Sequence, residues 1–367
     1  MKKHSHTMNS IRVILLCPIS LLFAYFMSVN PTFSEWYALN IYPIISKSIN
    51  TLSAAVPFSV AEIVVIVFFS LLLIYVLYTV IKLIFSEKRL QRLLDFVLNL
   101  AAIASIICFV FVFFCGVNYH RLTFTEVSGL NIEKSSTNEL YALCADLVSE
   151  ANSLRDSLSE NSNGVAETSV SYEELAKLCQ TAYDKLEPQY PTLISGYSTT
   201  KPVYFSDKMS YSGITGVFFP FTYEANVNVD VPQYTLPATM CHELTHLRGY
   251  MREDEANFIA YLACKESDEA FVRYSGYMLA LTHSLNRLYG DSTELYYEVY
   301  ESLSEKVKTD LRYNSSYWAA HEGFVNEISN RVNDVYLKVN NQDDGVKSYG
   351  RMVDLLLAEF KKSVFEE

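Results

Sequence analysis

Two histidines and a glutamate stand at a spacing that suits hydrolytic metal chemistry. His242 and His246 are four residues apart in the stretch Cys-His-Glu-Leu-Thr-His-Leu-Arg-Gly. Residues four apart lie on the same face of a helix, so both imidazoles can bind one ion. Glu243 projects about 100° further round the helix and can reach a water on that ion without being a ligand. The pattern therefore predicts half of a zinc site with a general base beside it.

A hydrolytic zinc site has three protein ligands and an open fourth position, so the chain must supply one more ligand. In metzincins a glycine follows three residues after the second histidine, and a third histidine three residues later. Gly249 matches that glycine, but Arg252 stands at the ligand position and its guanidinium has no lone pair to donate. The third ligand must come from the next segment. The gap from His246 to that segment is short, so Gly249 must turn the chain sharply, which glycine allows through a positive φ.

The next segment is Glu-Asp-Glu-Ala-Asn, residues 253–257. It resembles the Glu-x-x-Ala/Ser-Asp signature on the second helix of gluzincins, a class of zinc peptidases. It also looks like the Glu-x-Glu-Ala-Asn stretch of peptidases that cleave phage and DNA-damage regulators. The resemblance implies Glu253 as the third ligand and Asn257 in place of the aspartate that orients a ligand histidine. Glu255 is the alternative ligand.

The composition separates a basic part from an acidic part. Half of the 367 residues are hydrophobic, which is high for a wholly soluble protein. Residues 1–117 hold 8 Lys and Arg against 4 Asp and Glu, and residues 118–367 hold 21 against 37. The first part is therefore net +4 and the second net −16. Because phosphate binding requires clustered basic side chains, nucleic acid is excluded as the partner of the acidic part.

Three apolar runs predict a membrane domain over residues 1–117. The runs lie at about 13–29, 63–85 and 97–117, each long enough to cross about 30 Å of hydrocarbon. Residues 30–60 are expected to form a loop, with aromatic side chains suited to a membrane interface.

The basic residues of this domain lie on one side of the predicted membrane. They cluster before the first run and between the second and third runs: Lys2, Lys3, Arg12, Lys88, Arg89 and Arg92. The positive-inside rule then places the N-terminus in the cytoplasm. With three crossings of the cell membrane, everything after His120 is expected to lie outside the cytoplasm.

Residues 118–367 are expected to form a mostly helical soluble domain with a small β-sheet. Capping boxes open two of the predicted helices, at Ser136 and at Ser171. The predicted helices cover residues 137–157, 172–187, 257–264, 269–289, 293–308, 317–339 and 346–362. Short strands are predicted at Val203–Phe205 and between residues 216 and 229, just before the histidine helix. One of these strands either offers a free edge to an extended peptide or merely covers the core.

Zinc peptidases also use a side chain on a later helix to stabilise the oxyanion. Tyr274, Tyr277, His283 and Arg287 are candidates by residue type.

Seven cysteines include no Cys-x-x-Cys pair, which excludes a cysteine zinc knuckle or a thioredoxin-like site. A disulfide between Cys144 and Cys179 is geometrically possible between two helices. Buried free thiols are the favoured interpretation.

As a whole, the chain resembles an uncharacterised family of bacterial membrane proteins that carry a domain of unknown function. The resemblance implies a mainly α fold, with three transmembrane helices followed by a zincin-like domain. The residues predict a membrane-anchored zinc metallopeptidase, with Zn²⁺ held by His242, His246 and Glu253 and with Glu243 as general base. Its expected partners are a peptide or protein substrate and the lipid membrane. The alternative is a non-catalytic membrane receptor or assembly protein that keeps a structural zinc site.

Overall fold

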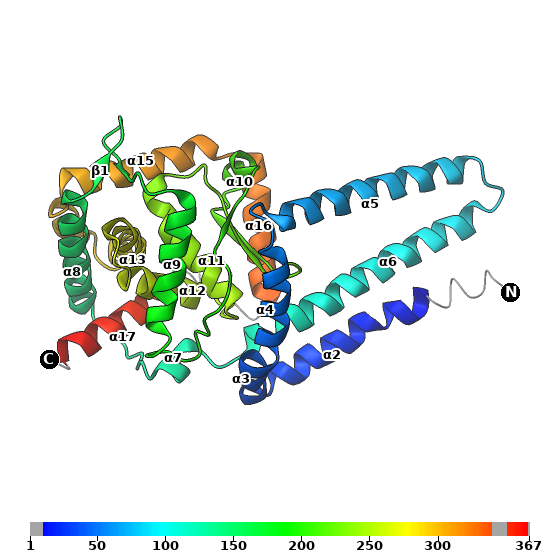
Figure 1. Cartoon of the computed structure of the whole chain (residues 1–367), viewed down its shortest axis with the longest axis horizontal. Helices are drawn as coiled ribbons and strands as arrows, with labels where there is room; N and C mark the ends of the chain where they lie inside the picture. Colours follow the sequence, from blue (N-terminus) through cyan, green and yellow to red (C-terminus); the bar gives the residue numbers. More distant parts are fainter. Residues whose placement is uncertain (1–9, 340–350, 366–367) are drawn as a thin grey trace.

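The computed structural model describes residues 10–339 and 351–365. It is mostly helical: three long apolar helices project from a compact helical body (Figure 1). Helix α2 (Leu16–Ser28) belongs to the stretch Ser10–Ser28, and α5 (Val60–Ile84) and α6 (Arg89–Phe114) follow. All three are long and apolar enough to cross a membrane, as predicted, although α6 begins and ends earlier than the sequence suggested.

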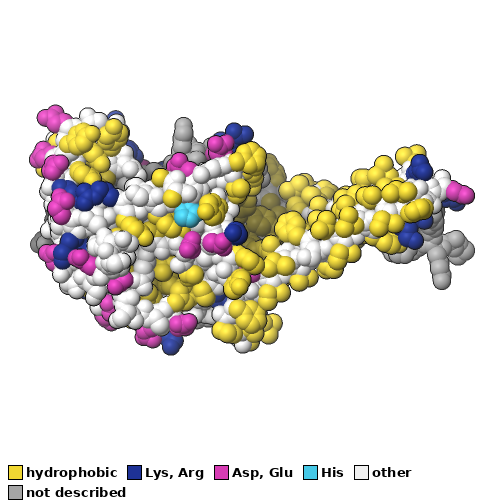
Figure 2. Space-filling model, turned by 90° about the horizontal axis from the view of Figure 1, so that it is seen from above, with side chains coloured by type: hydrophobic (Ala, Val, Ile, Leu, Met, Phe, Trp, Pro, Cys, Tyr) yellow, Lys and Arg dark blue, Asp and Glu magenta, His cyan; other side chains and the backbone are white. Residues whose placement is uncertain are grey.

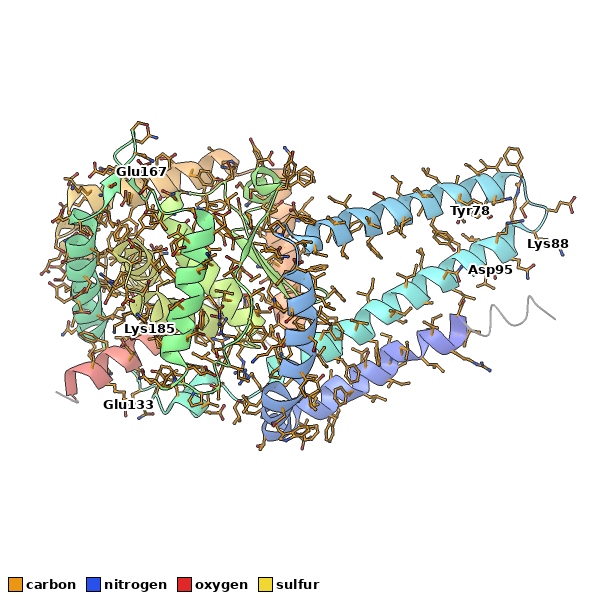
Figure 3. The ribbon with its side chains drawn as sticks, in the orientation of Figure 1. Tyr78, Lys88, Asp95, Glu133, Glu167 and Lys185 are labelled. Atoms are coloured by element: carbon orange, nitrogen blue, oxygen red, sulfur yellow. The ribbon has the colours of Figure 1, made fainter. Side chains whose placement is uncertain are left out.

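The surface of the projecting helices is apolar over most of its length. Figure 2 shows hydrophobic side chains covering these helices, with basic side chains gathered at their far end. In Figure 3, Lys88 and Asp95 lie near the turn between α5 and α6, whereas Glu133, Glu167 and Lys185 lie on the body. The loop with the cluster of basic residues and the helical body are therefore at opposite ends of the three apolar helices.

The segment between the first two apolar helices is helical, so the predicted loop at residues 30–60 is wrong. It forms α3 (Pro31–Asn40) and α4 (Tyr42–Ser53), each with a proline in its first turn, where the missing N–H costs nothing. Both helices pack against the body beyond residue 118. The Glu35 carboxylate, for example, makes a buried, bidentate ion pair with the Arg121 guanidinium at 2.7 and 2.8 Å. Local periodicity did not reveal these contacts because they join residues far apart in the sequence.

The body is built from helices packed around one hydrophobic core. Ser136 caps α8 with both hydrogen bonds of a capping box, and Ser171 caps α9 by accepting from the Glu174 N–H. The main helices are α8 (Thr137–Asp156), α9 (Tyr172–Leu186), α11 (Leu236–Leu247), α12 (Glu253–Lys265) and α13 (Ala270–Asp291). Shorter elements are η1 (Gly116–His120), α7 (Phe124–Ser128), α10 (Ser206–Tyr211) and η2 (Gln233–Thr235).

The last part of the chain has one more helix break than predicted. Residues 293–339 form three helices: α14 (Thr293–Glu301), α15 (Glu305–His321) and α16 (Phe324–Val339). The predicted helix at 293–308 is broken because Ser304 leaves the helical conformation and its side chain caps α15. The helix predicted at 346–362 corresponds to α17 (Met352–Phe365). Residues 346–350 of that prediction lie outside the described part of the chain.

Among the described residues the β-structure is small, as expected. Strands β3 (Lys201–Pro202), β5 (Glu224–Val227) and β4 (Gly216–Phe219) form one sheet in that order, with β3 parallel and β4 antiparallel to β5. A hairpin joins β1 (Ser159–Glu160) to β2 (Ala166–Glu167). The strand predicted at Val203–Phe205 is wrong, because the N–H groups of Tyr204 and Phe205 donate to the Glu62 carboxylate instead of to a neighbouring strand.

The thiols of Cys144 and Cys179 are free and buried in the core. They form no disulfide, and the favoured interpretation of both as buried thiols is confirmed.

Candidate metal centre

Helix α11 and the turn after it bring the predicted ligands together. Its first residues are Leu236 and Pro237, and proline at this position is pre-organised for a helix. The helix ends at Leu247, and Gly249 adopts a φ of 87°, the left-handed conformation expected of it. A side chain at this position would also crowd neighbouring groups, with contacts of 3.2 to 3.3 Å. The tight turn lets α12 begin at Glu253, beside the face that carries the histidines.

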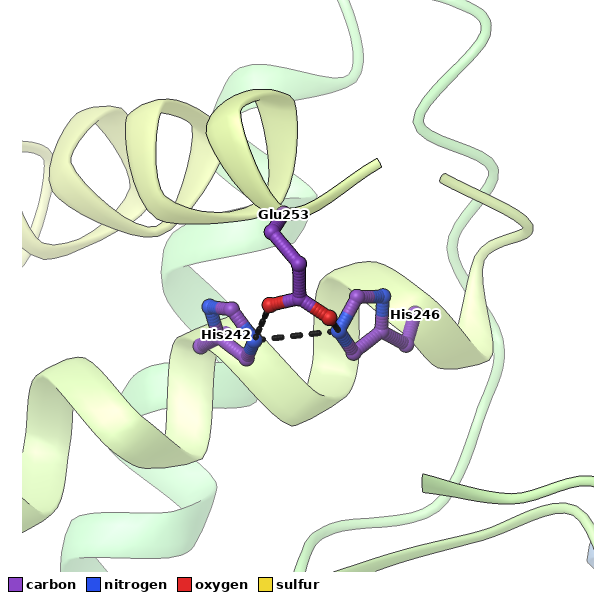
Figure 4. Close-up of side chains that lie close together, drawn as sticks. All are labelled: His242, His246 and Glu253. Atoms are coloured by element: carbon purple, nitrogen blue, oxygen red, sulfur yellow. Dashed lines mark hydrogen bonds and ion pairs between the residues drawn. The ribbon is translucent and has the colours of Figure 1, made fainter. Parts of the chain in front are cut away.

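The two imidazoles and the Glu253 carboxylate converge on one point (Figure 4). The Nε2 atoms of His242 and His246 are 3.0 Å apart. Glu253 Oε2 lies 3.2 Å from the first of these nitrogens and Oε1 lies 3.6 Å from the second. The ligand atoms all lie within 4.8 Å of one another. Two imidazole nitrogens and a carboxylate are a donor set that zinc prefers.

The far side of each imidazole ring is held by an oxygen acceptor. His242 Nδ1 is 2.8 Å from Asn257 Oδ1, as the resemblance implied, and His246 Nδ1 is 2.8 Å from the Tyr250 carbonyl oxygen. A carbonyl can only accept, so His246 must carry its proton on Nδ1. Asn257 Oδ1 likewise accepts from the His242 Nδ1–H. The Nε2 lone pairs of the two rings then face the same point. This geometry fits a bound cation, which would accept both lone pairs in place of the proton that His242 otherwise carries on this side.

Glu255, the alternative ligand, is engaged elsewhere. Its Oε1 accepts from the Phe124 backbone N–H at 2.8 Å and pairs with Arg252 at 3.1 Å. Arg252, at the metzincin ligand position, also donates to the Arg121 carbonyl oxygen. Of the two glutamates, Glu253 is therefore the one that the fold places with the histidines.

Glu243 is buried and points toward the same space. Its carboxylate accepts a hydrogen bond from the Phe218 backbone, while Oε2 has no hydrogen-bond partner among the described residues. A Cβ atom at Gly216 would lie 2.6 Å from Oε1, so only a glycine leaves room for this carboxylate. Burial raises the pKa of Glu243 to about 8, against the opposing effect of the His242 charge. A carboxylate that is both buried and partly unpartnered is suited to proton transfer.

The two histidines differ in their affinity for protons. Burial lowers the pKa of His242, but the hydrogen bond and charge of Glu253 outweigh burial and raise it to about 9. Burial and the His242 charge lower the pKa of His246 to about 4. Without a metal, the site therefore holds one proton between His242 and Glu253 at neutral pH, and a cation must displace that proton.

A cavity of about 830 Å³ opens over the cluster. The residues before and along β4 form one wall, from Gly213 to Phe218, and β4 is an edge strand of its sheet. Helix α13 forms another wall with Ser275, Met278 and His283.

Of the four oxyanion candidates, His283 alone lines this cavity. Burial and the His242 charge lower the pKa of His283 to about 4, so its ring is neutral and can donate one N–H. Tyr274 donates to the buried Asp310 carboxylate at 2.6 Å. Tyr277 packs against the ring of Tyr261. Arg287 pairs with acidic residues at the surface.

Two parts of the site were not foreseen from the sequence: the Tyr250 carbonyl and the glycine at position 216. A backbone acceptor carries no sequence signal. Gly216 could have been noted as a glycine at the start of an apolar strand, a position that often marks a close approach of another group.

Comparison with known proteins gives one match. The family model described as "Protein of unknown function (DUF3810)" matches residues 37–357, most of the chain. The chain belongs to the DUF3810 family. No curated protein and no solved structure matches the DUF3810 chain. The region matched by the family model begins in α3 and contains α5, α6 and all the residues of the candidate metal centre.

Proposed function

We propose that this DUF3810 protein is a membrane-anchored, zinc-dependent metallopeptidase with a zincin-like site. One observation carries the proposal: two imidazole nitrogens and the Glu253 carboxylate converge beside the buried Glu243 carboxylate, and all four side chains line one open cavity. His242, His246 and Glu253 would hold the ion. When bound, zinc supplies a Lewis acid that lowers the pKa of a coordinated water to about 7.

Glu243 moves the proton in the proposed reaction. Its Oε2 takes a proton from water as the water oxygen bonds to the amide carbonyl carbon. The carbon–nitrogen bond then breaks, and Glu243 passes the proton to the leaving amine. Gly216 and the Phe218 N–H fix the position of the carboxylate for both steps. His283, which lines the same cavity, would donate its N–H to the carbonyl oxygen as negative charge develops there.

The edge of β4 supports a peptide as the substrate. Strand β5 pairs with one side of β4, from Gly216 opposite Val227 to Phe219 opposite Glu224. No described strand pairs with its other side, and β4 residues line the cavity. An extended peptide can pair with such an edge through its backbone, which brings an amide bond toward the metal site.

The distribution of charge supports an extracytoplasmic site. The N-terminal end of α2 and the loop with Lys88 and Arg89 lie at the end of the apolar helices that faces away from the body (Figure 1). The positive-inside rule places that end in the cytoplasm, and so the body on the other side of the membrane. The histidines lie on α11, in the body, and not within one of the three apolar helices.

The rival proposal is a non-catalytic membrane receptor or assembly protein with a structural zinc site. Structural sites have a fourth protein ligand and a closed shell. Among the described residues the group contains three ligands and lines an open cavity, which favours catalysis.

The test compares Glu243→Gln with His242→Ala in the full chain, with exposed Glu173→Gln as the control. Each protein is assayed for zinc content and for cleavage of a broad peptide library. We expect Glu243→Gln to keep zinc and lose cleavage, His242→Ala to lose both, and the control to keep both. Undiminished cleavage by Glu243→Gln would falsify the proposed role.

A further inference from the structure

Helix α16 forms part of the wall of the metal cavity. Ser329, Asn330 and Asn333 lie on one face of α16 and line the cavity. The same face packs against the loop before β4, where a Cβ atom at Gly213 would collide with the Asn326 amide. This face is therefore polar and directed at the site.

The same helix is tied to the point where the third apolar helix enters the body. The Tyr119 hydroxyl donates to the Tyr336 hydroxyl at 2.8 Å. The Tyr336 ring meets the ring of Phe111, in the last turn of α6, edge to face at 6.2 Å between centroids. In Figure 1, α16 lies across the direction of α5 and α6, at their inner ends. If α6 crosses a membrane, α16 lies at its surface.

A second face of α16 is apolar and exposed. Its members recur three or four residues apart, so they form one stripe beside the cavity-facing side. The exposed fractions are 76% for Phe324, 55% for Val325, 46% for Ile328, 63% for Val332 and 61% for Val335. A third face carries Glu327, Arg331, Asp334 and Lys338, two charges of each sign. The helix thus presents a polar, an apolar and a charged face, and Val332 lies where the apolar stripe meets the cavity-facing side, because it also lines the cavity.

Other exposed aromatic side chains stand at the inner ends of the remaining two apolar helices. Phe33 and Trp36 lie on α3, which follows directly after α2. Tyr204 and Phe205 are fixed beside the start of α5, because their N–H groups donate to the Glu62 carboxylate. Tryptophan and tyrosine are enriched at membrane interfaces.

We propose that α16 lies in the interface of the same membrane that α2, α5 and α6 cross, with its apolar stripe in the lipid and its polar face over the metal cavity. Exposed apolar side chains at the inner ends of all three apolar helices favour the lipid surface over a second copy of the chain as the occupant. The charged face is neutral overall, so binding of α16 is driven by its apolar stripe and does not require anionic lipid.

This placement narrows the class of substrate, a step that rests on the proposed peptidase function. A cavity covered by an interfacial helix opens beside the bilayer. The polypeptide segments closest to the opening of this cavity are those that emerge from the same membrane. The substrate class is therefore an extended segment next to the membrane anchor of another polypeptide.

The test measures the depth of α16 and does not depend on hydrolysis. The full chain is placed in nanodiscs of neutral phosphatidylcholine, with or without bromine on the acyl chains, and its two natural tryptophans are replaced (W36F and W318F). Val335→Trp reports on the apolar stripe, because Val335 is exposed and does not line the cavity, and Glu327→Trp, on the charged face, is the matched control. Val325→Trp is the second reporter on the stripe, and circular dichroism with a cooperative thermal transition shows that each variant is folded.

We expect brominated lipid to remove most of the fluorescence of Val335→Trp and Val325→Trp and little of that of Glu327→Trp. The proposal is overturned if the stripe reporters emit as in water without quenching, or if all three positions are quenched equally. It is also overturned if the stripe reporters are unquenched and each nanodisc contains two chains, since a second copy would then cover the stripe.

Discussion

We expect Gly216→Ala to impair catalysis without weakening metal binding. The added methyl group would lie 2.6 Å from Glu243 Oε1, whereas an ordinary contact begins at 3.4 Å. The carboxylate must therefore move by about 0.8 Å, the difference between these two distances. The three atoms nearest to this methyl group all belong to Glu243, and the metal ligands lie on α11 and α12, so we expect the ligands to stay in place.

The magnitude follows from the role of the carboxylate. A positioned general base contributes about 10²- to 10⁴-fold to the rate, and a misplacement of about 1 Å costs on the order of 10²-fold. We therefore expect kcat/KM of Gly216→Ala to fall by about 10²-fold, with the loss in kcat, and zinc affinity to change by less than about threefold. The assay is cleavage of a peptide selected from the library digest, together with a competitive zinc titration.

Gly290→Ala is the matched control, because nothing lies within 4 Å of a Cβ atom at that position. It should keep both zinc and activity. If Gly216→Ala cleaved the peptide at the rate of the unmodified protein with zinc bound, the assignment of Glu243 as the base in this position would be wrong.

Three further predictions concern the groups around the ion. Asn257→Ala should weaken zinc binding by about 10- to 100-fold, measured by chelator competition, because the His242 ring loses its orienting acceptor. Zinc affinity should rise about tenfold per pH unit up to about pH 9 and then level off, since binding displaces the His242 proton that Glu253 holds; affinities independent of pH would contradict this. His283→Ala should lower kcat by about 10²- to 10³-fold and leave zinc content unchanged, as expected for an oxyanion donor; unchanged kcat would rule that role out.

The convergence of the three candidate ligands could be predicted from the sequence because it depends on short spacings. A spacing of four positions from His242 to His246 places both rings on one helix face. The glycine at 249 allows the turn, and the acidic segment after it supplies Glu253. Each of these inferences needs only local backbone geometry, and the same is true of the three apolar runs.

The surroundings of the site could not be predicted, because they are made by contacts between distant segments. The carbonyl of Tyr250 and the clearance at Gly216 depend on backbone positions. The burial of α3 and α4 against the body depends on pairs such as Glu35 with Arg121, 86 residues apart. The position of α16 over the cavity likewise follows from its contact with the end of α6. A helical pattern in the sequence reveals none of these partners.

The most direct measurement is the zinc content and coordination of the full chain purified in mild detergent. We predict one zinc per chain, with two nitrogen ligands and carboxylate oxygen in X-ray absorption. In the double variant His242→Ala and His246→Ala the zinc should be lost. A chain that takes up no zinc from a metal-supplemented buffer, or a double variant that keeps a full equivalent, would contradict the account.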